Sequence, residues 1–338
     1  MPEVRMVDAP VSESEAQAYR EGGLATFRKT RGPGRSLGVR DRALGVAASV
    51  LLVTLVLPSA VRAATPPPYS HSWYITNPTT SALQALGKSD GQFAAAYCTD
   101  SAVVLDFGQV GRDPTVTGYG GYGAYDFNSN LNYPFVTDVT ISSVVKSYAA
   151  YWYNYSGCAP ELHLIIGMSN YLECPYPSDN CDVYAAGQQL ASVVYAVNVY
   201  LQNNHYNSKV FAWAGDDMET GWDAASKTEQ FVNGFAASAQ AGYELIDYGD
   251  AWQNTGWTDS DVCYVAYALD DWPLPEVYSQ DAATRWTQVL SECYMFFRGA
   301  MSTTVGNSPN AAWSDLYNTL ASSGFGQSLE YSTYIQNQ

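Results

Sequence analysis

The sequence predicts an α/β fold, a single (β/α)8 barrel of the TIM type that tolerates irregularity, preceded by a signal peptide. Three observations support this. Short β-rich runs alternate with longer segments of helical spacing, which is typical of a parallel sheet covered by helices. About 275 of the 338 residues are left for this pattern, enough for one large domain, and the usual size of such a barrel is roughly 250 residues. Acidic residues recur where the β-rich runs end.

The expected elements follow from composition and spacing. Six β-rich runs are clear: 101–110, 161–170, 209–217, 243–252, 261–271 and 294–304. A seventh strand is expected within 117–135, and 328–335 is expected to close the ring. Helices are expected at 142–155, 185–204, 226–240, 281–293 and 310–324. In the third of these helices, Ser226 and Glu229 have the spacing of a capping box. A doubly wound open sheet is the alternative, although no GxGxxG motif follows the first strand.

The N-terminal part of the chain has the pattern of an export signal. An apolar run at 43–61 follows a basic stretch and ends in small residues. We therefore expect a leader over 1–64, an extended linker and lead-in over 65–98, and the barrel over 99–338. This pattern predicts a secreted protein. The alternative is an uncleaved leader that anchors the chain in a membrane, since the run approaches the length of a span.

Charge and cysteine content narrow the functional classes. Residues 1–63 hold 9 of the 16 basic and 6 of the 33 acidic residues, which leaves 7 basic and 27 acidic residues after them. Such an acidic surface repels phosphate backbones and argues against nucleic-acid binding.

All six cysteines follow the leader, as expected for disulfides in an exported chain. Cys174 and Cys181 flank a turn-rich loop and are expected to pair, and the other four allow three pairings. No metal site and no cofactor are expected, because the cysteine and histidine spacing fits no zinc motif.

Acids at the ends of the predicted strands are the candidate catalytic groups. The stretch FAWAGDDMETGW (211–222) places Asp217 and Glu219 on one face of a strand and Asp216 on the other, where it is expected to bond a backbone amide or cap a loop. Asp106 ends the first predicted strand. Two carboxylates on one face can have their pKa values pushed apart, so that one is an acid and the other is charged. Glycoside hydrolysis requires such a pair.

These motifs resemble the family 25 glycoside hydrolases, the muramidase-type lysozymes. That family has a β/α barrel with an Asp on its first strand and a D-x-E at the end of a later one, here VVLDFG with Asp106 and GDDMETG with Asp217 and Glu219. The resemblance implies that Glu219 is the proton donor and that Asp217 and Asp106 stabilise developing positive charge. The stretch 272–286 is also similar to secreted bacterial barrel domains related to this family. This D-x-E ends the third predicted strand, whereas the family has it on the fourth. The family's acid on the last strand has only Glu330 as a counterpart.

Residues near the same strand ends are the candidate substrate-binding groups. Aromatic rings stack on sugars, and Tyr and Trp are abundant near predicted strand ends. The expected substrate-binding set is Asp247, Asp270, Tyr171, Trp222, Trp252 and Trp272. The sequence thus predicts a secreted bacterial glycosidase that acts on a polysaccharide, with peptidoglycan one candidate. The alternative is a non-catalytic barrel that binds a glycan or a protein. Burial of Glu219 by a lid, or its pairing with Arg298, would favour that alternative.

Overall fold

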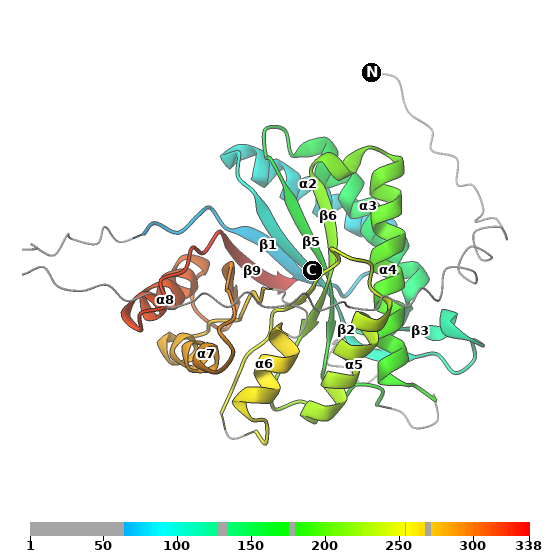
Figure 1. Cartoon of the computed structure of the whole chain (residues 1–338). Helices are drawn as coiled ribbons and strands as arrows, with labels where there is room; N and C mark the ends of the chain where they lie inside the picture. The colour runs from blue at the N-terminus through cyan, green and yellow to red at the C-terminus, as the bar shows by residue number, and fades with distance from the viewer. Residues whose placement is uncertain (1–63, 127–133, 176–179, 254, 268–271) are drawn as a thin grey trace, which may run out of the picture. The chain divides into compact units, whose positions relative to one another are not determined.

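A curled sheet of mainly parallel strands is the centre of the fold (Figure 1). The computed structural model describes residues 64–126, 134–175, 180–253, 255–267 and 272–338. The strands are β1 (Ser70–Tyr74), β2 (Ser101–Arg112), β3 (Tyr122–Tyr125), β4 (Phe135–Thr137), β5 (Leu162–Ser169), β6 (Val210–Asp217), β7 (Leu245–Asp247), β8 (Gly299–Thr303) and β9 (Tyr331–Asn337). Seven of them are neighbours in the order β7-β6-β5-β2-β1-β9-β8, and every pair along this path is parallel. The predicted α/β class is confirmed.

The strands form a half-barrel and do not close into the expected ring of eight. β7 and β8 are the two ends of the path and do not pair with each other. The segment 274–277 lies between them: Leu274 and Glu276 donate backbone hydrogen bonds to Asp247 and Gly249, and Val277 donates one to Met301. This segment forms only an isolated bridge, between Glu276 and Met301. Its sequence explains why, because the prolines at 273 and 275 have no N–H to donate to a ladder.

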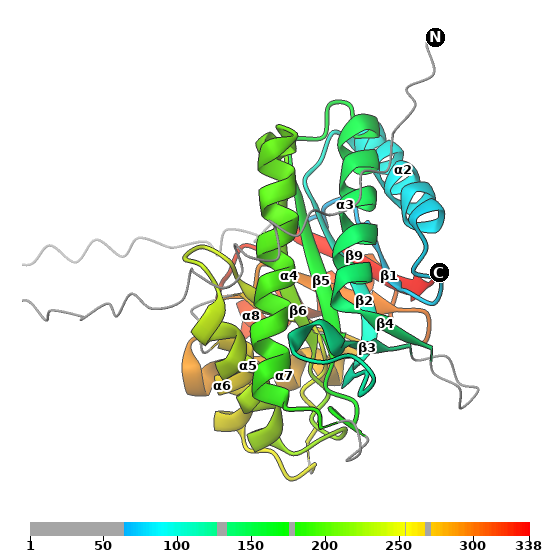
Figure 2. The same ribbon diagram turned by 90° about the vertical axis from the view of Figure 1, so that its right-hand side faces the viewer.

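Seven helices surround the curled sheet in the described part of the chain (Figures 1 and 2). They are α2 (Thr80–Tyr97), α3 (Asp138–Tyr155), α4 (Val183–Asn203), α5 (Ala225–Ser238), α6 (Asp259–Tyr267), α7 (Gln280–Cys293) and α8 (Pro309–Ser322). The five helices expected from spacing are all present. In α4, the residues predicted to face the core are buried: Leu190, Val193, Val194, Val197 and Leu201. Asp182 caps this helix by accepting a hydrogen bond from the Ala185 N–H.

The sheet divides the hydrophobic core into two parts. The larger part fills the space between the sheet and the helices, and the smaller part lies inside the curl. Strand β6 contributes to both, with Val210, Ala212 and Ala214 on the helix side and Trp213 inside. This confirms the alternation expected for β6 and fixes which of its later residues project inward.

Several segments differ from the sequence-based expectation. Residues 65–98 were expected to be a lead-in but hold β1 and α2; β1 is five residues long and gains its order by pairing with both β2 and β9. The stretch 261–271 was expected to be a strand, but its described part belongs to α6, which begins where Thr258 and Asp261 exchange hydrogen bonds. The aromatic stretch 117–135 holds β3 and β4, which form an antiparallel extension of β2 off the parallel path.

The helix start expected at Ser226 is also wrong. The residue that caps α5 is Ala224, which makes no side-chain hydrogen bond, so Ser226 and Glu229 lie within the helix.

Three disulfides join elements of this fold. Cys174–Cys181 forms as expected, and the other pairs are Cys98–Cys158 and Cys263–Cys293, the latter joining α6 to α7. Disulfides are typical of proteins in oxidising, extracytoplasmic compartments. The predicted leader lies outside the described residues. Within the described ranges, we find no helix with the length and apolarity needed to cross a bilayer.

Candidate functional site

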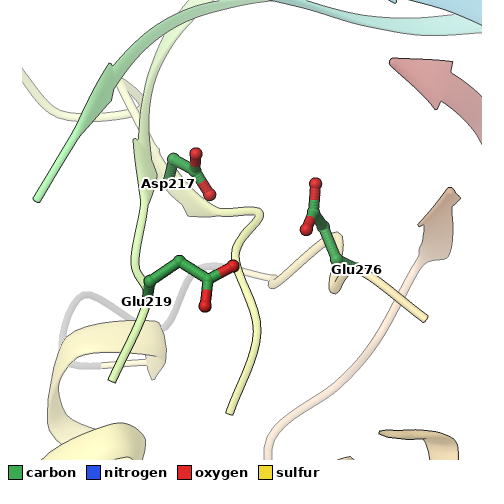
Figure 3. A group of neighbouring side chains, drawn as sticks. All are labelled: Asp217, Glu219 and Glu276. Carbon is green, nitrogen blue, oxygen red and sulfur yellow. The ribbon is translucent and has the colours of Figure 1, made fainter. Parts of the chain in front are cut away.

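Three carboxylates converge at the C-terminal ends of the strands (Figure 3). Asp217 ends β6, Glu219 follows it, and Glu276 lies on the segment between β7 and β8. One oxygen from each lies within 4.8 Å of one from each of the others. Figure 3 shows Asp217 and Glu219 projecting from one stretch of chain and Glu276 facing them from another. The D-x-E pair predicted from the sequence is therefore brought together with a third acid that the sequence analysis did not single out.

The backbone of Glu219 is held by an asparagine from the neighbouring strand. The side-chain amide of Asn170, just after β5, donates to the Glu219 carbonyl at 3.2 Å and accepts from the Glu219 N–H at 3.0 Å. Asn170 is fully buried and also donates to Thr228 Oγ1 at 3.2 Å. The position of the Glu219 carboxyl thus depends on β5 as well as β6, which restricts its movement.

Asp106 lies beside this cluster on β2, immediately before an irregularity in the strand. The register of β2 against β5 shifts between Asp106 and Gln109, and Gly108 within this shift has a φ of 97°, a conformation that favours glycine. The Gly108 N–H donates to Asp106 Oδ1 at 2.6 Å. Burial raises the pKa of Asp106 to about 7, while the Gly108 amide and the Tyr248 hydroxyl oppose the shift.

Two glycines create the floor of the site. Gly167 and Gly215 pair across β5 and β6, and Asp106 pairs with Gly167 on the other side. The ring of Tyr248 covers both glycines, and its hydroxyl donates to the Met168 carbonyl at 3.0 Å. A Cβ at Gly167 would come within 2.2 Å of the Tyr248 hydroxyl, so this aromatic floor requires glycine there.

Glu276 is the functional candidate that sequence reasoning missed. It is 1% exposed, and both of its carboxylate oxygens accept a hydrogen bond from a tyrosine: Oε1 from Tyr74 at 3.4 Å and Oε2 from Tyr278. The stretch WPLPEV contains the acid but does not have the alternation or length of a strand, and Tyr74 lies on β1, a strand that was not expected. The sequence does carry one signal for this residue: Glu276 directly follows a Pro-x-Pro, in a segment between two strands.

Burial dominates the electrostatics of the three acids. It raises the pKa of Glu219 to about 8, and Asp250 adds to the shift. It also raises the pKa of Asp217 well above its ordinary value, with Glu276 the next cause. The pKa of Glu276 is raised by burial and then by Glu219, while the Tyr74 hydroxyl opposes the shift. None of the ion pairs in the described ranges involves these three acids. The three acids therefore release their protons at higher pH than isolated carboxyls do, and each influences the titration of the others.

Two of the other acids lie on the opposite face of the sheet. Asp247 pairs in register with Asp216, and its neighbours Ile246 and Tyr248 belong to the inner core. By alternation both aspartates project toward the helices. Burial raises the pKa of Asp247 to about 8. The amide or cap partner expected for Asp216 is not found, because neither of its carboxylate oxygens accepts a hydrogen bond from the described residues. Asp270 lies outside the described residues.

Three of the four predicted aromatic residues follow strands at the same end of the sheet as the acids, and the fourth does not. Tyr171 and Trp222 follow β5 and β6 and contact each other edge to face, with ring centroids 5.4 Å apart. Trp252 follows β7 and is 51% exposed. Trp272 lies inside the other end of the curl, stacked on Tyr331 at the start of β9. Trp272 lies away from the acids because its large apolar ring is more stable in that interior than at the exposed edge of the sheet.

Arg298 belongs to that other end as well. Its guanidinium lies over the rings of Trp272 and Tyr331 and pairs with Glu330. It therefore does not pair with Glu219, and it stabilises the N-terminal end of the sheet.

The three converging oxygens are also close enough to hold a divalent cation, which binds carboxylate oxygens. Such an ion would bind only the ionised acids. Protons and a cation therefore compete for the same three carboxylates.

A comparison with protein-family models and with curated proteins found no match to this chain.

Proposed function

We propose that this chain is a secreted bacterial glycoside hydrolase that cleaves a glycosidic bond in a polysaccharide, with peptidoglycan one candidate substrate. The observation that supports this most directly is the convergence of Asp217, Glu219 and Glu276 at the C-terminal ends of parallel strands, where barrel enzymes place their catalytic groups. Hydrolysis of a glycosidic bond needs one protonated and one ionised carboxyl close together.

Glu219 is the general acid in this proposal. Burial raises its pKa to about 8, so at pH 7 it carries the proton that the leaving oxygen of the sugar needs. Asp106, with a pKa of about 7, is partly ionised at that pH and supplies negative charge beside the sugar ring, while Asp217 shares protons with the acids around it. The rings of Tyr171, Trp222 and Trp252 offer stacking surfaces for further sugar units.

The proposal extends to the barrel and to export. Segment 274–277 takes the place of the missing strand, so the barrel has eight members when counted from β1. Its fourth member is then β6 with the D-x-E, as in the family 25 glycoside hydrolases, and its second is β2 with Asp106, whereas that family has its acid on the first. Residues 1–64 are the leader of a secreted protein, and the three disulfides suit its destination.

Glycan release by the purified protein tests this function. The panel contains peptidoglycan, several neutral polysaccharides and the nitrophenyl glycosides of common sugars. We expect wild type to release sugar and Glu219→Gln to lose at least 100-fold in rate with an unchanged melting temperature, because the amide cannot donate a proton as an acid does. The matched control is Glu330→Gln, at the other end of the sheet, which should retain activity. Full activity of Glu219→Gln would contradict the assignment.

One observation favours the alternative of a non-catalytic glycan-binding protein. Glu219 is only 8% exposed, so a substrate must displace part of its surroundings to reach it. The same panel distinguishes the two functions. Binding of a glycan by wild type and by Glu219→Gln, with no release by either, would identify the protein as a binder.

A further inference from the structure

We propose that Glu276 is the second reacting carboxylate of the site, the nucleophile that forms a glycosyl ester with the substrate. This inference rests on the proposed glycosidase function and assigns a role that the D-x-E motif leaves open. The question is which acid attacks the anomeric carbon once Glu219 has protonated the leaving oxygen. Asp217 and Glu276 are the two candidates, because both lie within 4.8 Å of Glu219.

Position favours Glu276. Asp217 and Glu219 project from the same stretch of chain, whereas Glu276 faces them from the segment on the other side (Figure 3). The acid and the nucleophile of a glycosidase flank the scissile bond, so they must approach it from different sides. Glu276 meets this requirement, and Asp217, adjacent to Glu219 on the same strand end, does not.

Hydrogen bonding also favours Glu276. A nucleophile must be ionised, and in a cluster that shares protons the charge stays on the group that receives the most hydrogen bonds. Glu276 accepts one from Tyr74 and one from Tyr278, each at a different oxygen. Neither oxygen of Asp217 accepts any from the described residues, although the side chain is 1% exposed. Asp217 is therefore the acid that more readily stays protonated.

The two tyrosines are themselves held in place. Tyr74 ends β1 and pairs in register with Asp106. Burial raises the pKa of the Tyr74 hydroxyl well above its ordinary value, and the charges of four nearby acids raise it further, so the hydroxyl keeps the proton that it donates. Tyr278 packs against Gly306, where a Cβ would come within 2.7 Å of the ring. The two donors are thus fixed by β1 on one side and by the loop after β8 on the other, which orients the Glu276 carboxylate toward Glu219.

The separation of the carboxyls fits this role. Acids that react directly with the sugar lie about 5–5.5 Å apart, whereas a pair that places a water between them lies about 6.5–9.5 Å apart. One oxygen of Glu276 lies within 4.8 Å of one oxygen of Glu219, a close approach that is compatible with the shorter class. Glu276 bonds to the anomeric carbon as the glycosidic bond breaks, and the leaving oxygen takes the Glu219 proton. Water then attacks the same carbon, gives one proton to Glu219 and releases Glu276 as a carboxylate.

Covalent trapping tests the assignment. Wild type is incubated with the 2-deoxy-2-fluoro dinitrophenyl glycoside of whichever sugar the nitrophenyl panel shows it to hydrolyse, and the modified peptide is identified by mass spectrometry. We expect one glycosyl adduct, on Glu276. An adduct on Asp217 or Asp106, or hydrolysis with no adduct, would overturn the proposal while leaving the glycosidase function intact. No hydrolysis of any substrate by wild type would overturn both.

Variants provide a second readout that does not depend on trapping. Glu276→Ala should lose at least 1,000-fold in rate, and sodium azide should restore activity and yield a glycosyl azide, which a structural role would not produce. Tyr278→Phe removes one donor and keeps the ring, so it should lower kcat more than KM changes and move the acidic limb of the pH profile upward. Glu330→Gln is the control for both. Azide that restores nothing, with an unchanged pH profile in Tyr278→Phe, would contradict the role of Glu276.

Discussion

At the scale of single residues, the floor of the site depends on the absence of side chains. Gly215 is covered by Tyr248, and a Cβ there would lie 2.4 Å from Ile165 Cγ2 and 2.7 Å from Tyr248 Cε1. Gly215→Ala must therefore displace packed atoms of the inner core. We expect a loss of about 1–3 kcal/mol in the free energy of unfolding, measured by urea denaturation.

A second glycine provides the control for this substitution. A Cβ at Gly326 meets nothing within 4 Å, and the residue has no positive φ. Gly326→Ala should therefore stay within about 0.5 kcal/mol of wild type. Equal stability of the two variants would show that Tyr248 does not fill the space above Gly215.

At the scale of elements, the disulfides differ in how much chain they close. Cys98 ends α2 and pairs with Cys158 beyond α3, a separation of 60 residues, whereas Cys174 and Cys181 are 7 residues apart. Because a longer loop restricts the unfolded chain more, replacing Cys98 and Cys158 by alanine should cost about 4 kcal/mol, and replacing Cys174 and Cys181 about 2 kcal/mol. Urea denaturation of the two double variants measures the difference. A larger loss for the shorter loop would contradict this account.

The elements that sequence analysis could predict are those whose own pattern determines them. Helix α4 and strands β5 and β6 have long, regular apolar spacing, and their positions were expected closely. Strand β1 was not, because the polar run around His71 becomes ordered only between β2 and β9. Helix α6 was mistaken for a strand because it is only nine residues long and its continuous apolar run VCYVAY is rich in β-branched and aromatic residues, which are typical of strands.

The candidate site could be predicted only in part for the same reason. Asp217 and Glu219 share a face of one strand, so local alternation was enough to pair them. Glu276 reaches them from a segment held by single backbone hydrogen bonds to β7 and β8, and nothing local to the sequence indicates that register. Trp272 was expected at the site. It lies just before the segment 274–277 and packs in the inner core, at the end of the sheet opposite the acids.

At the scale of the whole molecule, the unusual feature is the number of buried acids whose pKa is raised. Burial raises the pKa of Asp106 and Asp250 to about 7 and that of Glu173, Glu219 and Asp247 to about 8, from ordinary values near 4. The folded protein therefore keeps protons that the unfolded chain has released. Stability must then fall as the pH rises from the ordinary pKa values of these acids toward their raised values in the folded protein. In that range the unfolded chain binds fewer protons than the folded protein does.

The melting temperature should accordingly be higher at pH 5 than at pH 8, which differential scanning calorimetry at constant ionic strength can measure. Each acid that stays protonated contributes a slope of about 1.4 kcal/mol per pH unit.

The net charge of −17 acts in the same direction through repulsion, so a local variant is needed to separate the effect of net charge from that of the buried acids. Asp247→Asn keeps an acceptor for the Gly249 N–H but removes one buried carboxyl that titrates. The melting temperature of this variant should therefore fall less steeply with pH than that of wild type. Glu292→Gln removes the same formal charge from an exposed position on α7 and should leave the slope nearly unchanged. A melting temperature that rises from pH 5 to pH 8 would mean that these acids are ionised in the folded protein, and Glu219 would then lack the proton that its proposed role requires.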